Sequence, residues 1–169
     1  MSDKGAFGVI RSLFASVNGE DPGHVFHSKT DGERRFRVRG DIIAPIPNCF
    51  AEIIVNGEVV RTNTPSPKQT PARAYEHHFD ETVKLNGSGW IAVRCWEPHP
   101  EGRLRFAHTA PWFIEVEGKP LRPRREEAEF LVKRVEEEIS RSNAFLTPAA
   151  LEEYRQALGI FEAIAQAAK

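Results

Sequence analysis

The sequence predicts a mainly β protein, an antiparallel immunoglobulin-like β-sandwich of seven or eight strands followed by a tail of two helices. Three observations predict this fold class. Short runs of alternating apolar and polar residues fill the chain between positions 9 and 117. Turn signals of Gly, Pro and Asn separate these runs, and from position 124 the apolar spacing changes to three and four residues. We expect a β-sandwich domain at 1–121 and a helical hairpin at 122–169.

The strongest strand predictions are two segments with clear alternation. In 34–43, apolar residues share one face and charged residues share the other. In 90–96, one face is aliphatic and the other carries Trp90, Arg94 and Trp96. Further strands are expected at 9–17, 49–55, 58–61, 75–85 and 111–117.

Turn and cysteine patterns predict further features of the β domain. The dipeptide Asn56-Gly57 stands between two β-branched runs and predicts a tight hairpin. The Pro-rich segment 62–74 is typical of an exposed loop. Cys49 and Cys95 lie in strand-like segments. Because a chain of this size forms a core without a covalent staple, we expect two buried free thiols rather than a disulfide.

Two amphipathic stripes predict the helical hairpin. Thr147-Pro148 supplies an N-cap and a Pro at the first position of the second helix, and the connecting loop is expected around 143–146. Because such stripes need an apolar partner, we expect the tail to pack on the Trp90/Trp96 face of the sandwich, with a homodimer interface as the alternative. The stripes comprise Ala128, Leu131, Val132, Val135 and Ile139, then Leu151, Tyr154, Leu158 and Phe161.

Composition narrows the classes of partner. The chain has 23 basic and 24 acidic residues and a net charge of -1, so no overall field attracts nucleic acid or an anionic membrane. No apolar run approaches the roughly 20 residues of a bilayer span, and the polar N-terminus lacks the layout of a signal peptide. We expect a soluble chain without nucleic-acid or membrane partners, although a longer parent protein could be exported.

An ordered set of segments resembles a known family. The set consists of VNGEDPGHVF (17–26), EIIVNGEVV (52–60), SGWIAVRCW (88–96) and FAHTAPWFIEVEGKPL (106–121). It resembles the region after the catalytic barrel in CehA/McbA-type metallohydrolases of the PHP (polymerase and histidinol phosphatase) superfamily. The barrel itself, which opens with a His-x-His strand motif, has no counterpart here. The resemblance therefore implies a non-catalytic accessory or interaction domain, without catalytic residues, metal or cofactor of its own, whose partner is the catalytic PHP domain.

Five residues are candidates for an interface or a ligand site. Trp90, Arg94 and Trp96 share one strand face, and two indoles beside a guanidinium are also typical of a carbohydrate-binding module, which is the alternative function. His108 and Thr109 precede a strand. They either line the junction with a catalytic barrel or satisfy backbone groups at the strand entry.

The six histidines do not predict a metal site. Adjacent His77 and His78 point to opposite faces of a strand, so at most one of them could join a site. His24 and His27 lie near a turn, where surface or hydrogen-bonded roles are favoured over a shared ion.

Overall fold

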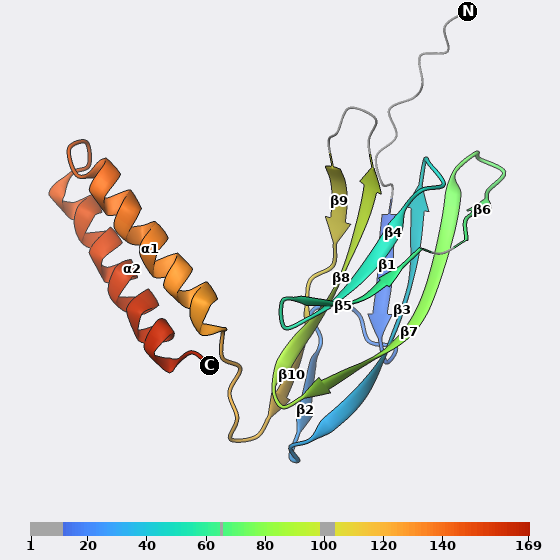
Figure 1. Cartoon of the computed structure of the whole chain (residues 1–169), viewed down its shortest axis with the longest axis horizontal. Helices are drawn as coiled ribbons and strands as arrows, with labels where there is room; N and C mark the ends of the chain where they lie inside the picture. The colour runs from blue at the N-terminus through green and yellow to red at the C-terminus, as the bar shows by residue number, and fades with distance from the viewer. Residues whose placement is uncertain (1–11, 65, 99–103) are drawn as a thin grey trace, which may run out of the picture. The chain divides into compact units, whose positions relative to one another are not determined.

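The computed structural model describes residues 12–64, 66–98 and 104–169. The chain divides into two compact units between Pro120 and Leu121. Figure 1 shows the strands of the first unit and the helical hairpin of the second.

The first unit is a sandwich of two sheets. The described residues form ten strands instead of the seven or eight predicted. The four-stranded sheet has the order β1-β3-β7-β6, and the larger sheet has the order β2-β10-β8-β4-β5, with β9 paired to β8. The strands are β1 (Ser12–Val17), β2 (Val25–Ser28), β3 (Glu33–Ala44), β4 (Phe50–Val55), β5 (Glu58–Asn63), β6 (Lys68–Gln69), β7 (Tyr75–Asn86), β8 (Gly89–Pro98), β9 (Leu104–His108) and β10 (Trp112–Val116).

Three of the observed strands are not among the predicted ones. Strands β2 and β9 are four and five residues long, and β6 is a two-residue pairing inside the segment predicted as a loop. Strand β2 also pairs parallel to β10, so the larger sheet is mixed rather than wholly antiparallel. Positions 9–11 of the first predicted strand lie outside the described residues.

The alternation predicted for the long strands is confirmed, because their inward side chains form one core between the sheets. Strand β3 contributes Phe36, Val38 and Ile42, none more than 4% exposed. The thiols of Cys49 and Cys95 are buried and free. The remaining large members of the core include Ile53, Phe79, Val83, Leu85, Ile91, Val93, Trp112 and Ile114.

The hairpin predicted at Asn56-Gly57 is confirmed. Strands β4 and β5 are antiparallel on either side of it. Both turn residues have positive φ, 51° at Asn56 and 88° at Gly57, which is the combination that a two-residue β-turn of this hand requires. The Asn56 side chain also accepts a hydrogen bond of 2.9 Å from the amide of Trp90, which fixes the turn to β8.

The second unit is an antiparallel pair of helices, α1 (Arg125–Ser142) and α2 (Pro148–Ala167). The predicted N-cap is confirmed, since the amide of Ala150 donates to the Thr147 hydroxyl at 3.3 Å. Leu131 departs from the predicted stripe and is 44% exposed, because it lies one position to the side of the row formed by Ala128, Val132 and Val135. Neither described helix has the length and apolar character that a bilayer span requires. Packing of this unit on the sandwich, or on a second chain, stays a prediction.

Candidate functional site

The outer face of the larger sheet carries aromatic and aliphatic side chains. These residues alternate with the buried ones along each strand, so they point away from the core. Strand pairing places them in rows across the sheet. We call this surface the aromatic face. It consists of Phe50, Glu52, Ile54, Trp90, Ala92, Arg94, Trp96, Phe106, His108 and Phe113.

One row of the aromatic face is built from three rings. Phe50 of β4, Trp96 of β8 and Phe106 of β9 are direct cross-strand neighbours. The ring centroids of Trp96 and Phe106 lie 5.3 Å apart at a tilt of 47°. Phe106 remains 57% exposed, so the row ends in an apolar ring that contacts water.

The adjacent row is polar and is organised by one carboxylate. Glu52 of β4 accepts hydrogen bonds from Nε and Nη2 of Arg94, at 2.8 and 2.6 Å. It also accepts a bond of 2.5 Å from the indole Nε1 of Trp96. The side chains of Glu52 and Arg94 are only 16% and 32% exposed. The guanidinium carbon of Arg94 lies 4.4 Å from the centre of the Trp96 ring, a cation–π contact.

His108 and Thr109 have different surroundings. His108 stacks on Phe106 with ring centroids 6.2 Å apart, and its Nδ1 hydrogen-bonds to the carbonyl oxygen of Thr109 at 3.0 Å. Thr109 is buried, and its hydroxyl accepts from the amide of Val93 at 3.1 Å. Its own amide donates to the Val93 carbonyl at 2.9 Å. His108 therefore belongs to the aromatic face, whereas Thr109 extends the pairing of the chain with β8.

Trp90 is separated from Trp96. Its cross-strand neighbour is Phe113 of β10, and six strand positions along β8 correspond to roughly 20 Å. The structure thus brings Arg94, Trp96 and His108 together with Glu52 and Phe106, but it leaves Trp90 in another part of the face. A single sugar ring cannot stack on both indoles.

The outer face of the four-stranded sheet has the opposite character. We call it the charged face, because its outward side chains in β3 and β7 are mostly ionic. Asp80 accepts from Nε and Nη2 of Arg37 at 2.7 and 2.5 Å and lies 3.2 Å from Nε of Arg39. The hydrogen bond from Arg37 lowers the pKa of Asp80. Lys84 pairs with Glu33 at 2.8 Å.

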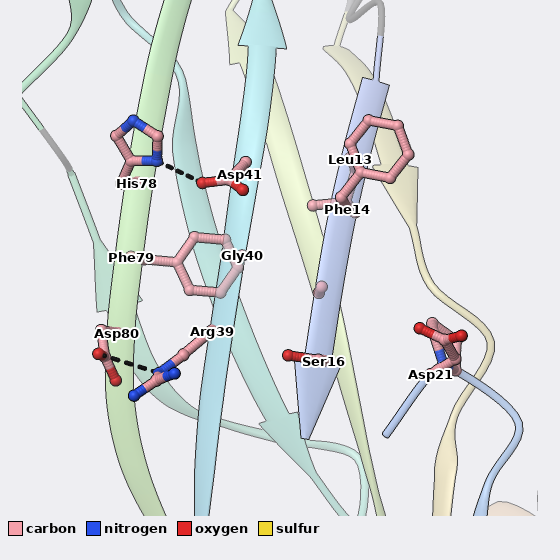
Figure 2. A pocket seen from close by; sticks show the side chains of 12 residues that line it. Leu13, Phe14, Ser16, Asp21, Arg39, Gly40, Asp41, His78, Phe79 and Asp80 are labelled. Carbon is pink, nitrogen blue, oxygen red and sulfur yellow. Dashed lines mark hydrogen bonds and ion pairs between the residues drawn. The ribbon is translucent and has the colours of Figure 1, made fainter. Parts of the chain in front are cut away.

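A shallow depression of about 760 Å³ crosses the charged face. Figure 2 shows its two rows of side chains on β1, β3 and β7. We call it the dish. His78 is joined to Asp41 by a hydrogen bond through Nδ1. The dish is lined by Leu13, Phe14, Ala15, Ser16, Asp21, Pro22, Arg39, Gly40, Asp41, His78, Phe79 and Asp80.

The histidines and cysteines form no metal site in the described part of the chain. No three His, Cys, Asp or Glu side chains there converge on a common point. His24 pairs with Glu20 and His27 with Glu115, each at 3.4 Å. His77 is fully buried, and its neighbour His78 lies on the charged face, as predicted for adjacent strand residues. His99 lies outside the described residues.

The two thiols are not poised as nucleophiles. The neighbouring Cys95 and the burial of the side chain raise the pKa of the Cys49 thiol. Both cysteines are at most 1% exposed, so a substrate has no access to either sulfur.

Comparison with known proteins gives low-scoring structural similarities. No family model matches the chain, and no curated protein matches it. CopC from Methylosinus trichosporium OB3b is 12% identical, with 65% of this chain and 100% of CopC covered and a TM-score of 0.32. The CARDB domain of PF1109 from Pyrococcus furiosus is 10% identical, with 62% of this chain and 95% of that domain covered and a TM-score of 0.32.

The architecture defines the class of protein. Two packed sheets, formed mostly by antiparallel pairs, make an immunoglobulin-like β-sandwich with two C-terminal helices. Similarities as low as those to CopC and the CARDB domain transfer no activity or ligand. The resemblance to PHP-superfamily hydrolases stays a prediction.

Proposed function

We propose that this chain is a non-catalytic interaction domain that binds a protein partner through its aromatic face. The partner in this proposal is the catalytic barrel of a PHP-type metallohydrolase. The observation that carries the proposal is the cluster in which Glu52 fixes both Arg94 and Trp96 beside the exposed ring of Phe106.

Trp, Tyr and Arg side chains dominate the binding energy of many protein interfaces. On the aromatic face these side chains are already held in place, because one carboxylate binds both Arg94 and Trp96. The side chains of Arg94 and Trp96 therefore lose little rotamer entropy when a partner binds. A row of rings that ends in an exposed Phe is also the kind of surface that a soluble protein buries against a partner.

The choice of a PHP barrel as partner rests on the sequence resemblance and on where its segments lie. Three of the four resembling segments, 52–60, 88–96 and 106–121, form most of β4, β5, β8, β9 and β10. The motif set therefore builds the sheet that carries the aromatic face. The same segments also supply core residues such as Ile91 and Ile114, and the proposal takes their outward residues as the contact surface.

The carbohydrate-binding alternative has weaker support on this face. Trp90 and Trp96 are too far apart to sandwich one ring, and Arg94 covers one side of the Trp96 indole. The guanidinium of Arg94 is also committed to Glu52. A sugar would have to displace an arranged ion pair to reach these groups.

The test begins with the genomic locus of this chain. The proposal expects a coding segment with a His-x-His motif, in the same reading frame or next to it. That barrel and this chain are produced as separate polypeptides, and their affinity is measured by calorimetry. We expect Phe106→Ala to weaken binding roughly thirty-fold, which corresponds to a hot-spot loss of about 2 kcal/mol.

The matched control is Phe14→Ala on the charged face. Phe14 is an exposed Phe of the opposite sheet, 65% exposed against 57% for Phe106, so its loss removes a similar apolar area. The proposal expects Phe14→Ala to bind the barrel like the unchanged protein. Equal affinity for all three proteins, or a locus without a barrel, would refute the proposed partner.

A further inference from the structure

We propose that the dish on the charged face binds a neutral, polyhydroxylated ring, such as one unit of an oligosaccharide. The dish lies on the sheet opposite to the aromatic face, so this inference is independent of the proposed function. It is carried by the combination of an exposed ring, a hollow and an arranged set of hydrogen-bonding groups.

The strand register puts the lining groups in two rows, visible in Figure 2. Phe14 of β1, Asp41 of β3 and His78 of β7 form one row. The next row runs from Ser16 through Arg39 to Asp80. Successive rows on one face of a sheet are two residues apart, or roughly 7 Å. A six-membered sugar ring has the size to contact both rows.

Gly40 lies between the two rows, in the floor of the dish. A Cβ at this position would meet the ring of Phe79 and the carbonyl oxygen of Phe14. Gly40 thus leaves room for the Phe79 ring and for the backbone of β1 beside it. Most of the dish is lined by residues of β1, β3 and β7, and Asp21 and Pro22 come from the segment after β1.

The polar groups of the dish are held by one another. Asp41 is fixed by His78, and Asp80 is fixed by Arg37 and Arg39. Each carboxylate has four lone-pair positions, so these contacts leave room for further hydroxyl donors. Arg39 and Ser16 supply donors in the second row. The arrangement offers both donors and acceptors, which is what a ring with several hydroxyl groups needs.

The charge balance favours a neutral ligand. Two of the three lining carboxylates are already paired, Asp80 with the guanidiniums of Arg37 and Arg39 and Asp41 with His78. This pairing reduces the charge that an entering ion would meet, which favours a neutral ligand over an anion or a cation. A wholly apolar ligand would bury paired charges without replacing their water.

Phe14 supplies the apolar part of the contact. Its ring is 65% exposed and stands at one end of the dish. The C–H face of a sugar packs well on such a ring, while its hydroxyls reach the polar rows. Because the dish is open to solvent, it covers only part of a ligand, and we expect a weak dissociation constant of about 1 mM.

The experiment titrates the full chain with maltohexaose, xylohexaose and mannohexaose, up to about 10 mM, and follows backbone amide shifts by NMR. We expect at least one of these sugars to shift amides of 14–16, 39–41 and 78–80. Phe14→Ala should weaken that binding at least ten-fold, and Asp41→Asn should also weaken it. Phe106→Ala is the control and should bind as the unchanged protein does.

Three results would overturn the inference. One is the absence of shifts with every sugar in the panel. Another is a set of shifts confined to β8 and β9, which would move sugar binding to the aromatic face and support the Trp/Arg alternative. The third is a Phe14→Ala variant that keeps its folded spectrum and its full affinity. The first and third results leave untouched the question of whether a PHP barrel binds at Phe106, so the two proposals can fail separately.

Discussion

The two outer faces of the sandwich follow the same strand alternation and present opposite chemistry. On the charged face, long side chains pair with one another in water, as Arg37 does with Asp80. On the aromatic face, rings and one half-buried ion pair pack on the sheet. Both sheets bury similar aliphatic side chains inside. The inner faces therefore hold the domain together, and the outer faces are where the two proposals place a partner and a ligand.

The comparison also separates two kinds of ion pair. Each face has one carboxylate that binds more than one nitrogen donor. Asp80 is about half exposed, and solvent screens it. Glu52 is 16% exposed and binds Arg94 and the indole of Trp96. Losing Glu52 would leave a half-buried guanidinium and an indole N–H without that acceptor, which is costlier than losing an exposed pair.

The largest expected effect comes from removing these carboxylates one at a time. We expect Glu52→Ala to reduce the free energy of unfolding by about 2 kcal/mol, and Asp80→Ala to reduce it far less. Urea denaturation monitored by tryptophan fluorescence measures both changes. Arg94→Leu serves as a further control, because an apolar stem in place of the guanidinium should lower the cost of losing Glu52 in the double variant.

If Asp80→Ala proves as destabilising as Glu52→Ala, the contrast between a screened and a half-buried ion pair is wrong for this domain. The charged face would then contribute to stability in its own right. In that case its ion pairs would have to be treated as a connected network.

A smaller effect is expected from acid. The pKa of Asp80 is lowered by its hydrogen bond with Arg37, and that of Asp31 by its hydrogen bond with Lys119. Because the folded-state pKa lies below the unfolded value of 3.8, the stabilisation is complete above that value. It is lost as the pH falls through the folded-state pKa. Thermal melts between pH 6 and pH 2 should therefore show Asp80→Asn losing less stability on acidification than the unchanged protein.

Salt gives the matching control, since about 0.5 M NaCl screens exposed pairs. It should reduce the difference between the two acid curves. If the acid curves of the unchanged protein and of Asp80→Asn coincide at both low and high salt, the pair of Asp80 with Arg37 does not form in solution.

Strand alternation carried most of the fold prediction. Period-2 patterns in β3 and β8 identified the inward residues correctly, because a full-length strand repeats the signal several times. Strands β2 and β6 are too short to show a period, and their pairing comes from longer neighbours. Leu131 fits the helical spacing and is nevertheless exposed, because spacing alone does not fix where the stripe ends.

The candidate site was only partly predictable. Trp96, Arg94 and His108 stood out by residue type, but their partners Glu52 and Phe106 did not. Those partners are set by register, since Glu52 lies opposite Arg94 and Phe106 opposite Trp96. A predicted hairpin between 90–98 and 104–108 could have found Phe106. The dish is not predictable from the sequence pattern, because its rows come from three strands whose alignment is set by register.

The smallest expected effect is on the stability of the two Phe variants that separate the proposals. Both rings are more than half exposed, so neither substitution opens a cavity. Phe14→Ala should change the free energy of unfolding by less than about 0.5 kcal/mol. Phe106 contacts Trp96 and His108, and aromatic pairs are worth about 0.5–1.5 kcal/mol, so Phe106→Ala should cost more. Urea midpoints with unchanged m-values check this order. The reverse order would mean that Phe14 is a structural part of the charged face, and a loss of sugar binding in Phe14→Ala would then reflect a damaged sheet.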